Sequence, residues 1–223
     1  MKKEFSFYEF TGVLLPGTTL LFGLIWLFPN LQPILTSKEL SLGSLGLFVI
    51  AAYLSGHLIQ SVGNILEYLL WMPSKRPTHW ITWKKVPYIG KKQLEKLPAM
   101  LKELTGNDYE DLSALETSDT DAIGKQLNST LKKESRTERI EIFNGNYGMF
   151  RGIAASAFTI AVITLFVNGS IKPWANTYIA LVVFAVACYR CYRFGKHYAS
   201  EIYSQSFSLY QQKLNPIKEE KKP

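Results

Sequence analysis

Four stretches of this 223-residue sequence are nearly free of charged residues and long enough to cross a lipid bilayer. They cover approximately residues 11–28, 43–59 with a helical continuation to 71, 150–167 and 174–189. A segment in hydrocarbon must satisfy its backbone polar groups internally, and an α-helix of about 20 residues does so. The sequence therefore predicts an all-α membrane protein with four transmembrane helices.

The first apolar stretch has some features of a secretory signal peptide. Lys2 and Lys3 precede it, but Glu4 and Glu9 lie in the same short region. No small-x-small pattern follows Phe28, where a cleavage site would be expected. We therefore expect this stretch to be retained as the first membrane helix.

The distribution of Lys and Arg predicts the orientation. The net charge is +7, yet only Lys38 and Lys172 lie in the two short loops that join the helices of each pair. The other 23 basic residues lie near the termini, in the long central segment or at its edge. Because basic residues concentrate on the cytoplasmic side, we expect both termini and the central segment to be cytoplasmic. This accounts for the basic charge without a nucleic-acid partner.

The chain divides into four expected parts. Residues 1–71 form the first transmembrane helix pair, and residues 149–189 form the second pair. Residues 72–148 between them form a small helical cytoplasmic domain, and residues 190–223 form a cytoplasmic amphipathic helix with a disordered tail. The central part has too few apolar residues for a large core of its own. We expect it to pack on its own membrane helices or on a soluble partner protein.

Two helices are expected in the central part. The first covers residues 91–104 and ends at Gly106, although Pro98 weakens its middle. The second covers approximately residues 121–143, and the Gly- and Asn-rich residues 144–148 favour a break or hinge before the third span. Apolar residues recur at helical spacing in both: Leu94, Leu97, Leu101 and Leu104 in the first, Ile123, Leu127 and Leu131 in the second.

The region after the fourth span predicts an aromatic, amphipathic helix up to about Lys213. This helix either continues the fourth span or lies along the membrane surface. Residues 218–222 are rich in Lys and Glu, and we expect them to be disordered.

Aromatic residues near the ends of the spans predict anchoring at the membrane interface. Trp80 and Trp83 are interleaved with basic residues, and Trp71 and Trp174 lie at span ends. A ligand surface is the alternative for Trp80 and Trp83. His79 and His197 are isolated in the sequence and are expected to be interfacial rather than catalytic.

A polar stripe runs along the second span. Its members are spaced by three or four residues, which places them along one side of a helix: Tyr53, His57, Gln60, Asn64, Glu67 and Trp71. Small residues Ala52, Gly56 and Gly63 lie beside it. Polar side chains are costly in contact with lipid. We therefore expect the stripe to bond helices together, or to line a pore or ion path.

Arg151 opens the third span at a depth similar to that of Glu67 if the second and third spans are antiparallel neighbours. The sequence predicts an ion pair between Glu67 and Arg151. The alternative is that Arg151 binds a lipid phosphate at the inner leaflet.

Two further motifs have mainly structural interpretations. Pro16 and Gly17 predict a kink in the first span, because proline leaves a backbone carbonyl without its usual donor. Cys188 and Cys191 have CxxC spacing, but a zinc site needs four ligands and no second pair exists. Acylation at the inner interface is the remaining functional interpretation of this pair.

The sequence contains none of the short motifs that mark common catalytic or nucleotide sites, such as a Walker loop, GxSxG or HExxH. We therefore expect no enzymatic activity, no catalytic residue, no metal and no cofactor.

Three sequence patterns together resemble a known group of proteins. Tyr8-Glu9-Phe10 precedes Leu14-Leu15-Pro16-Gly17, Gly56-His57-Leu58-Ile59-Gln60 lies in the second span, and Tyr147-Gly148-Met149-Phe150-Arg151 opens the third. The chain resembles small uncharacterised four-span bacterial inner-membrane proteins, some of which are found in phage-defence or conflict operons. The resemblance implies a multi-pass protein of the bacterial inner membrane, and no catalytic residues.

These observations lead to three functional hypotheses. The first is a subunit of an oligomeric membrane assembly, a sensor or pore-forming effector of a bacterial defence system, with the polar stripe at an interface or pore. The second is a membrane scaffold that recruits a soluble partner through residues 72–148 and the tail. The third is a small ion-coupled transporter, for which flux should be sensitive to Glu67→Gln.

Overall fold

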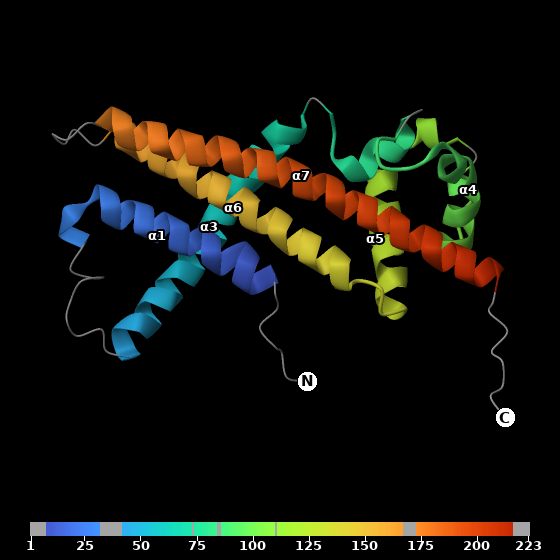
Figure 1. Ribbon diagram of the computed structural model, residues 1–223, viewed down its shortest axis with the longest axis horizontal. Coiled ribbons are helices and arrows are strands. Elements are labelled where there is room, and N and C mark those ends of the chain that lie inside the picture. The colour runs from blue at the N-terminus through green and yellow to red at the C-terminus, as the bar shows by residue number, and fades with distance from the viewer. Residues whose placement is uncertain are drawn as a thin grey trace. The chain divides into compact units, whose positions relative to one another are not determined.

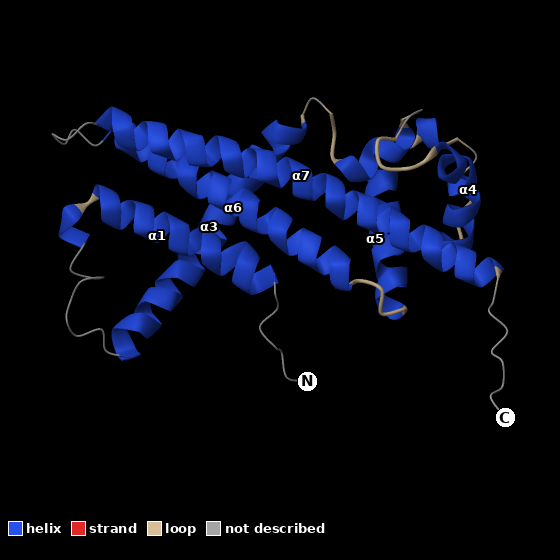
Figure 2. Ribbon diagram, viewed as in Figure 1, coloured by secondary structure: helices blue, strands red, loops and turns tan. Residues whose placement is uncertain are grey.

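A computed structural model describes residues 8–31, 42–72, 74–83, 86–109, 111–166 and 173–215. These residues form helices and contain no strand (Figure 2). The elements in chain order are η1 (Glu9–Leu14), α1 (Leu15–Leu27), η2 (Pro29–Leu31), α3 (Leu42–Trp71), η3 (Pro77–Thr82), α4 (Lys91–Thr105), η4 (Leu112–Ala114), α5 (Thr117–Lys133), α6 (Glu138–Phe166) and α7 (Pro173–Leu214) (Figure 1).

The expectation of four membrane-crossing helices is confirmed at the level of length and composition. Four helical segments are long and apolar enough to cross a membrane: Glu9–Leu27, Leu45–Trp71, Glu138–Phe166 and Ala175–Leu214. The first of these joins η1 to α1 without a break. The chain is therefore a helical protein with the features of a multi-pass membrane protein.

The structure separates into two compact units. Unit 1 consists of Met1–Pro73 and Glu141–Phe194, and unit 2 consists of Ser74–Ile140 and Gly195–Pro223. Helices α6 and α7 each contribute residues to both units.

Small residues set the helix contacts of unit 1. A Cβ atom added to Gly17 would lie 1.8 Å from the carbonyl oxygen of Ala52, and one added to Gly56 would lie 2.1 Å from that of Val13. Such distances are far below van der Waals contact, so η1 and α1 approach α3 with only glycine between the backbones. This close approach is typical of membrane helices, whose association depends on packing of small residues.

Larger apolar side chains form the core of unit 2. Leu97 and Leu101 of α4 and the three residues Ile123, Leu127 and Leu131 of α5 are all fully buried. The sequence therefore predicted the inward faces of both helices correctly. The predicted end of α4 is also correct, because Gly106 follows the helix with a left-handed φ of 76°. Glycine adopts this conformation at low cost and commonly ends helices.

The predicted helix over residues 121–143 is wrong in its boundaries. α5 ends at Lys133, and α6 begins at Glu138 after a turn in which Ser135 has a positive φ of 55°. The predicted break at residues 144–148 is also wrong, because α6 continues through them. Gly148 packs against the ring of Tyr8, so its lack of a side chain serves helix packing rather than a hinge.

The helix after the fourth span is a continuation of that span. α7 runs without interruption from Pro173 to Leu214. Residues 218–222, expected to be disordered, lie outside the described residues.

Candidate functional site

The start of the first span creates a hydrogen-bond acceptor inside unit 1. The segment Glu9–Leu14 is a π-helix, and Pro16 has no N–H to donate to the carbonyl of Gly12 four residues earlier. The side-chain amide of Gln60 donates to this carbonyl and also, at 3.3 Å, to that of Gly148. The hydroxyl of Ser156 donates to the carbonyl of Pro16 at 2.9 Å. The carbonyl of Gly12 is thus hydrogen-bonded to α3, and that of Pro16 to α6.

Arg151 lies at the centre of a polar cluster that joins three segments. Its guanidinium forms an ion pair with Glu67 and donates to the side-chain oxygen of Gln60, with distances of 3.1 Å from Nε and 2.7 Å from Nη2. A longer contact of 3.5 Å runs to the hydroxyl of Tyr8. We call these four residues, Tyr8, Gln60, Glu67 and Arg151, the Arg151 cluster.

The Arg151 cluster is shielded from the surroundings. The side chain of Glu67 is 5% exposed and that of Arg151 is 16% exposed. A buried ion pair of this kind is weak evidence for net stability, but removal of one partner leaves an uncompensated charge and is strongly destabilising. The occupied guanidinium favours the ion pair over binding of a lipid phosphate.

Glycines provide the space for this cluster. A Cβ atom added to Gly63 would lie 3.2 Å from Cγ of Arg151, and one added to Gly148 would lie 2.8 Å from the ring of Tyr8. The polar residues and the small residues therefore belong to one packing arrangement. Spacing indicated each set separately, and only the contacts reveal their dependence.

The polar stripe predicted in the second span divides into two groups. Gln60, Glu67 and Trp71 turn inward, and the indole of Trp71 donates to the hydroxyl of Tyr147 at 2.9 Å. His57 and Asn64 are exposed, and Tyr53 is half-buried with its ring edge-on to that of His57. Residues that share one side of a helix span a wide sector. The small residues occupy the centre of the buried face of α3, and the polar stripe lies along its border.

A new surface feature follows from this division. The exposed polar residues of α3 are spaced at i, i+4, i+7 and i+11, which forms one line along the outside of the helix. We call them the outer stripe: His57, Ser61, Asn64 and Tyr68. Ser61 and Tyr68 were not identified from the sequence. Ser61 follows His57 by four residues and Tyr68 follows Asn64 by four, so helical spacing indicates both.

The tryptophans expected at the membrane interface have different environments. Trp71 is buried in unit 1 and stacks on Tyr192, with ring centroids 5.1 Å apart. Trp80 is only 2% exposed and lies in the core of unit 2, where it donates to the carbonyl of Ser74 at 2.7 Å. Its burial does not agree with interfacial anchoring. Trp83 is partly exposed. The side chain of Trp174 lies outside the described part of the structure.

His79 is not isolated in the folded chain. Its ring is buried in unit 2, where Nδ1 is hydrogen-bonded to the hydroxyl of Thr120 and Nε2 lies 3.5 Å from a carboxylate oxygen of Asp121. Burial lowers the pKa of His79, with Arg76 and Lys75 acting in the same direction and Asp121 opposing them. The partners lie about 40 residues away in sequence, so local spacing could not reveal them.

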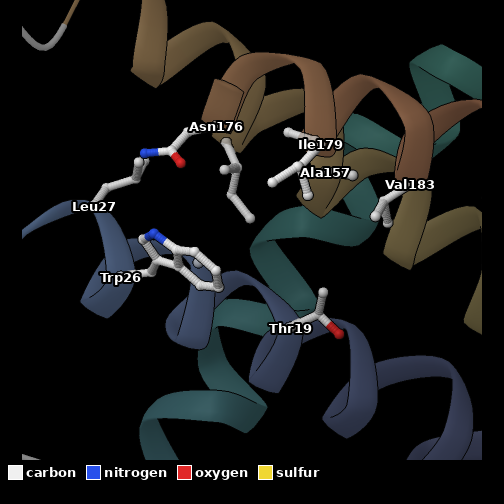
Figure 3. Close-up of a pocket in the computed structure, with 10 residues that line it drawn as sticks. Thr19, Trp26, Leu27, Ala157, Asn176, Ile179 and Val183 are labelled. Atoms are coloured by element: carbon white, nitrogen blue, oxygen red, sulfur yellow. The ribbon is translucent and has the colours of Figure 1, made fainter. Parts of the chain in front are cut away.

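Unit 1 also contains an apolar groove of about 190 Å³. Trp26 and Thr19 of α1 lie on one side of it, opposite Asn176, Ile179 and Val183 of α7 (Figure 3). None of the described residues that line the groove is ionisable. This described lining therefore suits hydrocarbon.

Comparison with known proteins adds no assignment: no family model, no curated protein and no solved structure matches this chain. Cys188 and Cys191 are free thiols, and no group of three His, Cys, Asp or Glu side chains in the described residues could hold a metal. The geometry itself offers an internal charge cluster that holds helices together and an exposed polar line on α3.

Proposed function

We propose that this protein is a non-enzymatic subunit of a homo-oligomeric assembly in the bacterial inner membrane, and that its copies meet along the outer stripe of α3. The observation that carries the proposal is the exposure of His57, Ser61 and Asn64 within the candidate span Leu45–Trp71. The transmembrane environment of α3 is part of the proposal.

A second exposed helix face in unit 1 provides the contrast. The exposed residues of α7 between 175 and 189 carry no amide, imidazole or charged group. Tyr178 and Tyr189, which lie near the two ends of this stretch, are the only polar-tipped members. Such a face, aliphatic in the middle with Tyr at the ends, is typical of contact with lipid. The outer stripe of α3 has the opposite character and requires a different neighbour.

A second copy of α3 is the neighbour that fits. Polar side chains within a membrane helix are costly when they face hydrocarbon, and hydrogen bonds across helices offset that cost. His57, Ser61 and Asn64 each offer a donor and an acceptor, so two stripes can pair with each other. Two-fold symmetric dimers, in which the same patch meets itself, are the commonest homo-oligomers, and larger rings are compatible with the same face.

The Arg151 cluster fixes the rotational orientation of α3, and with it the position of the outer stripe. Arg151 holds both Gln60 and Glu67 inward, and the amide of Gln60 also donates to backbone carbonyls. This prevents rotation of α3 about its axis, because rotation would separate a buried ion pair. The outer stripe is thereby kept on the outside.

At the finer level, we propose a sensor or pore-forming effector, with unit 2 on the cytoplasmic side and a role in bacterial defence. This proposal rests on the sequence resemblance and on the polar character of the interface. It predicts that activation of the expressed protein collapses the membrane potential, and that His57→Leu reduces the effect. An unchanged potential under activating conditions would remove the pore version and favour a scaffold.

Disulfide cross-linking in native membranes tests the interface. Asn64→Cys, in a chain with Cys188→Ala and Cys191→Ala, should yield a covalent dimer after mild oxidation. The matched control, Val182→Cys on the apolar face of α7, should remain monomeric. Equal cross-linking of Asn64→Cys and Val182→Cys would indicate random collision. Ser61→Cys is a second variant on the outer stripe, and the absence of cross-linking in both Asn64→Cys and Ser61→Cys would contradict the proposed interface.

A further inference from the structure

Unit 2 contains a polar groove that the proposed membrane interface does not involve. It has a volume of about 340 Å³ and lies between α4 and the C-terminal part of α7. Lys92 and Lys96 line it from α4, and Ser204, Ser208 and Gln211 line it from α7. Phe207, which is 5% exposed, provides an apolar surface in the same groove.

The charges of the groove are all of one sign. Lys92 and Lys96 are exposed and lie one turn apart on α4, and among the described residues that line the groove none is acidic. Arg136 donates to the lining hydroxyl of Ser208 at 3.1 Å and to Gln212, which places a third cation beside the groove. The groove therefore attracts anions.

Lys92 and Lys96 repel each other along α4, and only Glu95 beside them carries the opposite charge on this part of the helix. Like charges at i and i+4 repel each other on a helix surface. Basic residues near a helix N-terminus also oppose the helix dipole, and the first turn of α4 contains no acidic residue. A bound anion would offset both effects. Local features that oppose stability are often found at functional sites.

The hydrogen-bonding groups across the groove complete a site for phosphate. Ser204, Ser208 and Gln211 are spaced at i, i+4 and i+7, so they form one line on α7 opposite the lysines. Hydroxyl and amide donors can bind the oxygens of a phosphate while lysine supplies charge. The volume exceeds what a phosphate alone requires, and Phe207 offers contact to an organic group.

We propose that the groove formed by Lys92, Lys96, Ser204, Phe207, Ser208 and Gln211 binds a phosphate ester. The phosphate contacts the lysines and the hydroxyl line, and the ester group lies against Phe207. An anionic lipid headgroup and a soluble phosphate ester share this chemistry. The site is independent of the outer stripe, so it can be tested whether or not the protein is an oligomer.

Hydrogen–deuterium exchange of the full chain in nanodiscs separates the two sources. The first arm compares phosphatidylcholine nanodiscs with and without phosphatidylglycerol. The second arm adds ATP, or inorganic phosphate alone, to phosphatidylcholine nanodiscs. We expect slower exchange at residues 91–96 and 204–211 in one of the arms. Protection with phosphatidylglycerol identifies a lipid headgroup, and protection with ATP identifies a soluble ester. No protection in either arm would overturn the proposal.

Paired charge variants test the location. Lys92→Gln with Lys96→Gln removes two charged contacts and should weaken binding of the effective probe about tenfold or more. The control, Lys125→Gln with Lys132→Gln, removes the same charge from exposed positions of α5 that do not line the groove. It should bind like the wild type. Equal weakening by both pairs would mean a general effect of net charge and would overturn the assigned site.

Discussion

The two units of the molecule differ in what they bury. In unit 1, alanines such as Ala52 and Ala155 are buried, together with the charged Glu67, whereas Leu47 and Leu58 are at least 70% exposed. In unit 2, Leu97, Leu127 and other large aliphatic side chains are fully buried, and Lys and Glu residues are largely exposed.

This contrast supports the proposal of two different solvents, hydrocarbon around unit 1 and water around unit 2. In water, burial of large apolar side chains is the main source of stability. In hydrocarbon, large apolar side chains gain little from burial, and close packing and polar contacts hold helices together. Large apolar side chains should therefore contribute more to the stability of unit 2, and close packing of small residues should contribute more to that of unit 1. Substitutions can test this.

Disruption of the Arg151 cluster should have the largest effect. Glu67→Leu leaves the charge of Arg151 buried without its partner and should lower the free energy of unfolding by about 3–5 kcal/mol. Unfolding in SDS, followed by circular dichroism in mild detergent, measures this. The double variant Glu67→Leu with Arg151→Leu should recover much of the loss. Additive losses in the double variant would mean that the two side chains are not coupled.

Leucine truncation should separate the units most clearly. Leu127→Ala creates a cavity in the core of unit 2 and should cost about 2–5 kcal/mol. Leu58→Ala, at a position that is 74% exposed in unit 1, should change stability by about 0.5 kcal/mol or less. The same unfolding assay compares them. Similar losses for the two variants would contradict the assignment of different solvents.

Glycine substitution should show the complementary sensitivity of unit 1. Gly17→Ala places a methyl group against the carbonyl of Ala52 and should cost about 3 kcal/mol, because helix backbones must separate. Gly46→Ala is the matched control in α3, since no atom of the described residues lies within 4 Å of its added Cβ. The control should be neutral or slightly stabilising. If thermal unfolding gives the same midpoint for both variants, close packing of α1 on α3 is not important.

The smallest effect is expected from the pH dependence of unit 2. Burial lowers the pKa of His79 in the folded state below its usual value of 6.5, so the unfolded state binds a proton more readily. The contribution of His79 to the free energy of unfolding should be constant above about pH 6.5. It should fall as the pH is lowered toward the pKa of His79 in the folded state. The slope cannot exceed that of one proton, about 1.4 kcal/mol per pH unit. His79→Gln should remove this dependence, measured by tryptophan fluorescence during denaturation. An unchanged slope would assign it to other groups.

The features that could be predicted from the sequence are those that depend on neighbours along the chain. Hydropathy predicted the four long helices, and helical spacing predicted the buried faces of α4 and α5. The left-handed residue after α4 followed from Gly106, because glycine tolerates that conformation.

The features that could not be predicted from the sequence depend on tertiary packing. Residues 144–148 have the composition of a hinge, but they lie within the continuous helix α6, where Gly148 packs against the ring of Tyr8. Spacing placed Gln60 and Asn64 on one stripe, yet Arg151 draws only Gln60 inward. The partners of His79 and the burial of Trp80 likewise depend on residues that are distant in sequence or on the core of unit 2.

The outer stripe as an interface between copies is the central claim, and native mass spectrometry from mild detergent tests it most directly. The wild-type chain should appear as a defined oligomer. His57→Leu with Asn64→Leu should shift it to monomer while circular dichroism remains unchanged, since neither side chain belongs to the Arg151 cluster. A monomeric wild-type protein, or an oligomer of unchanged mass in the double variant, would contradict the claim.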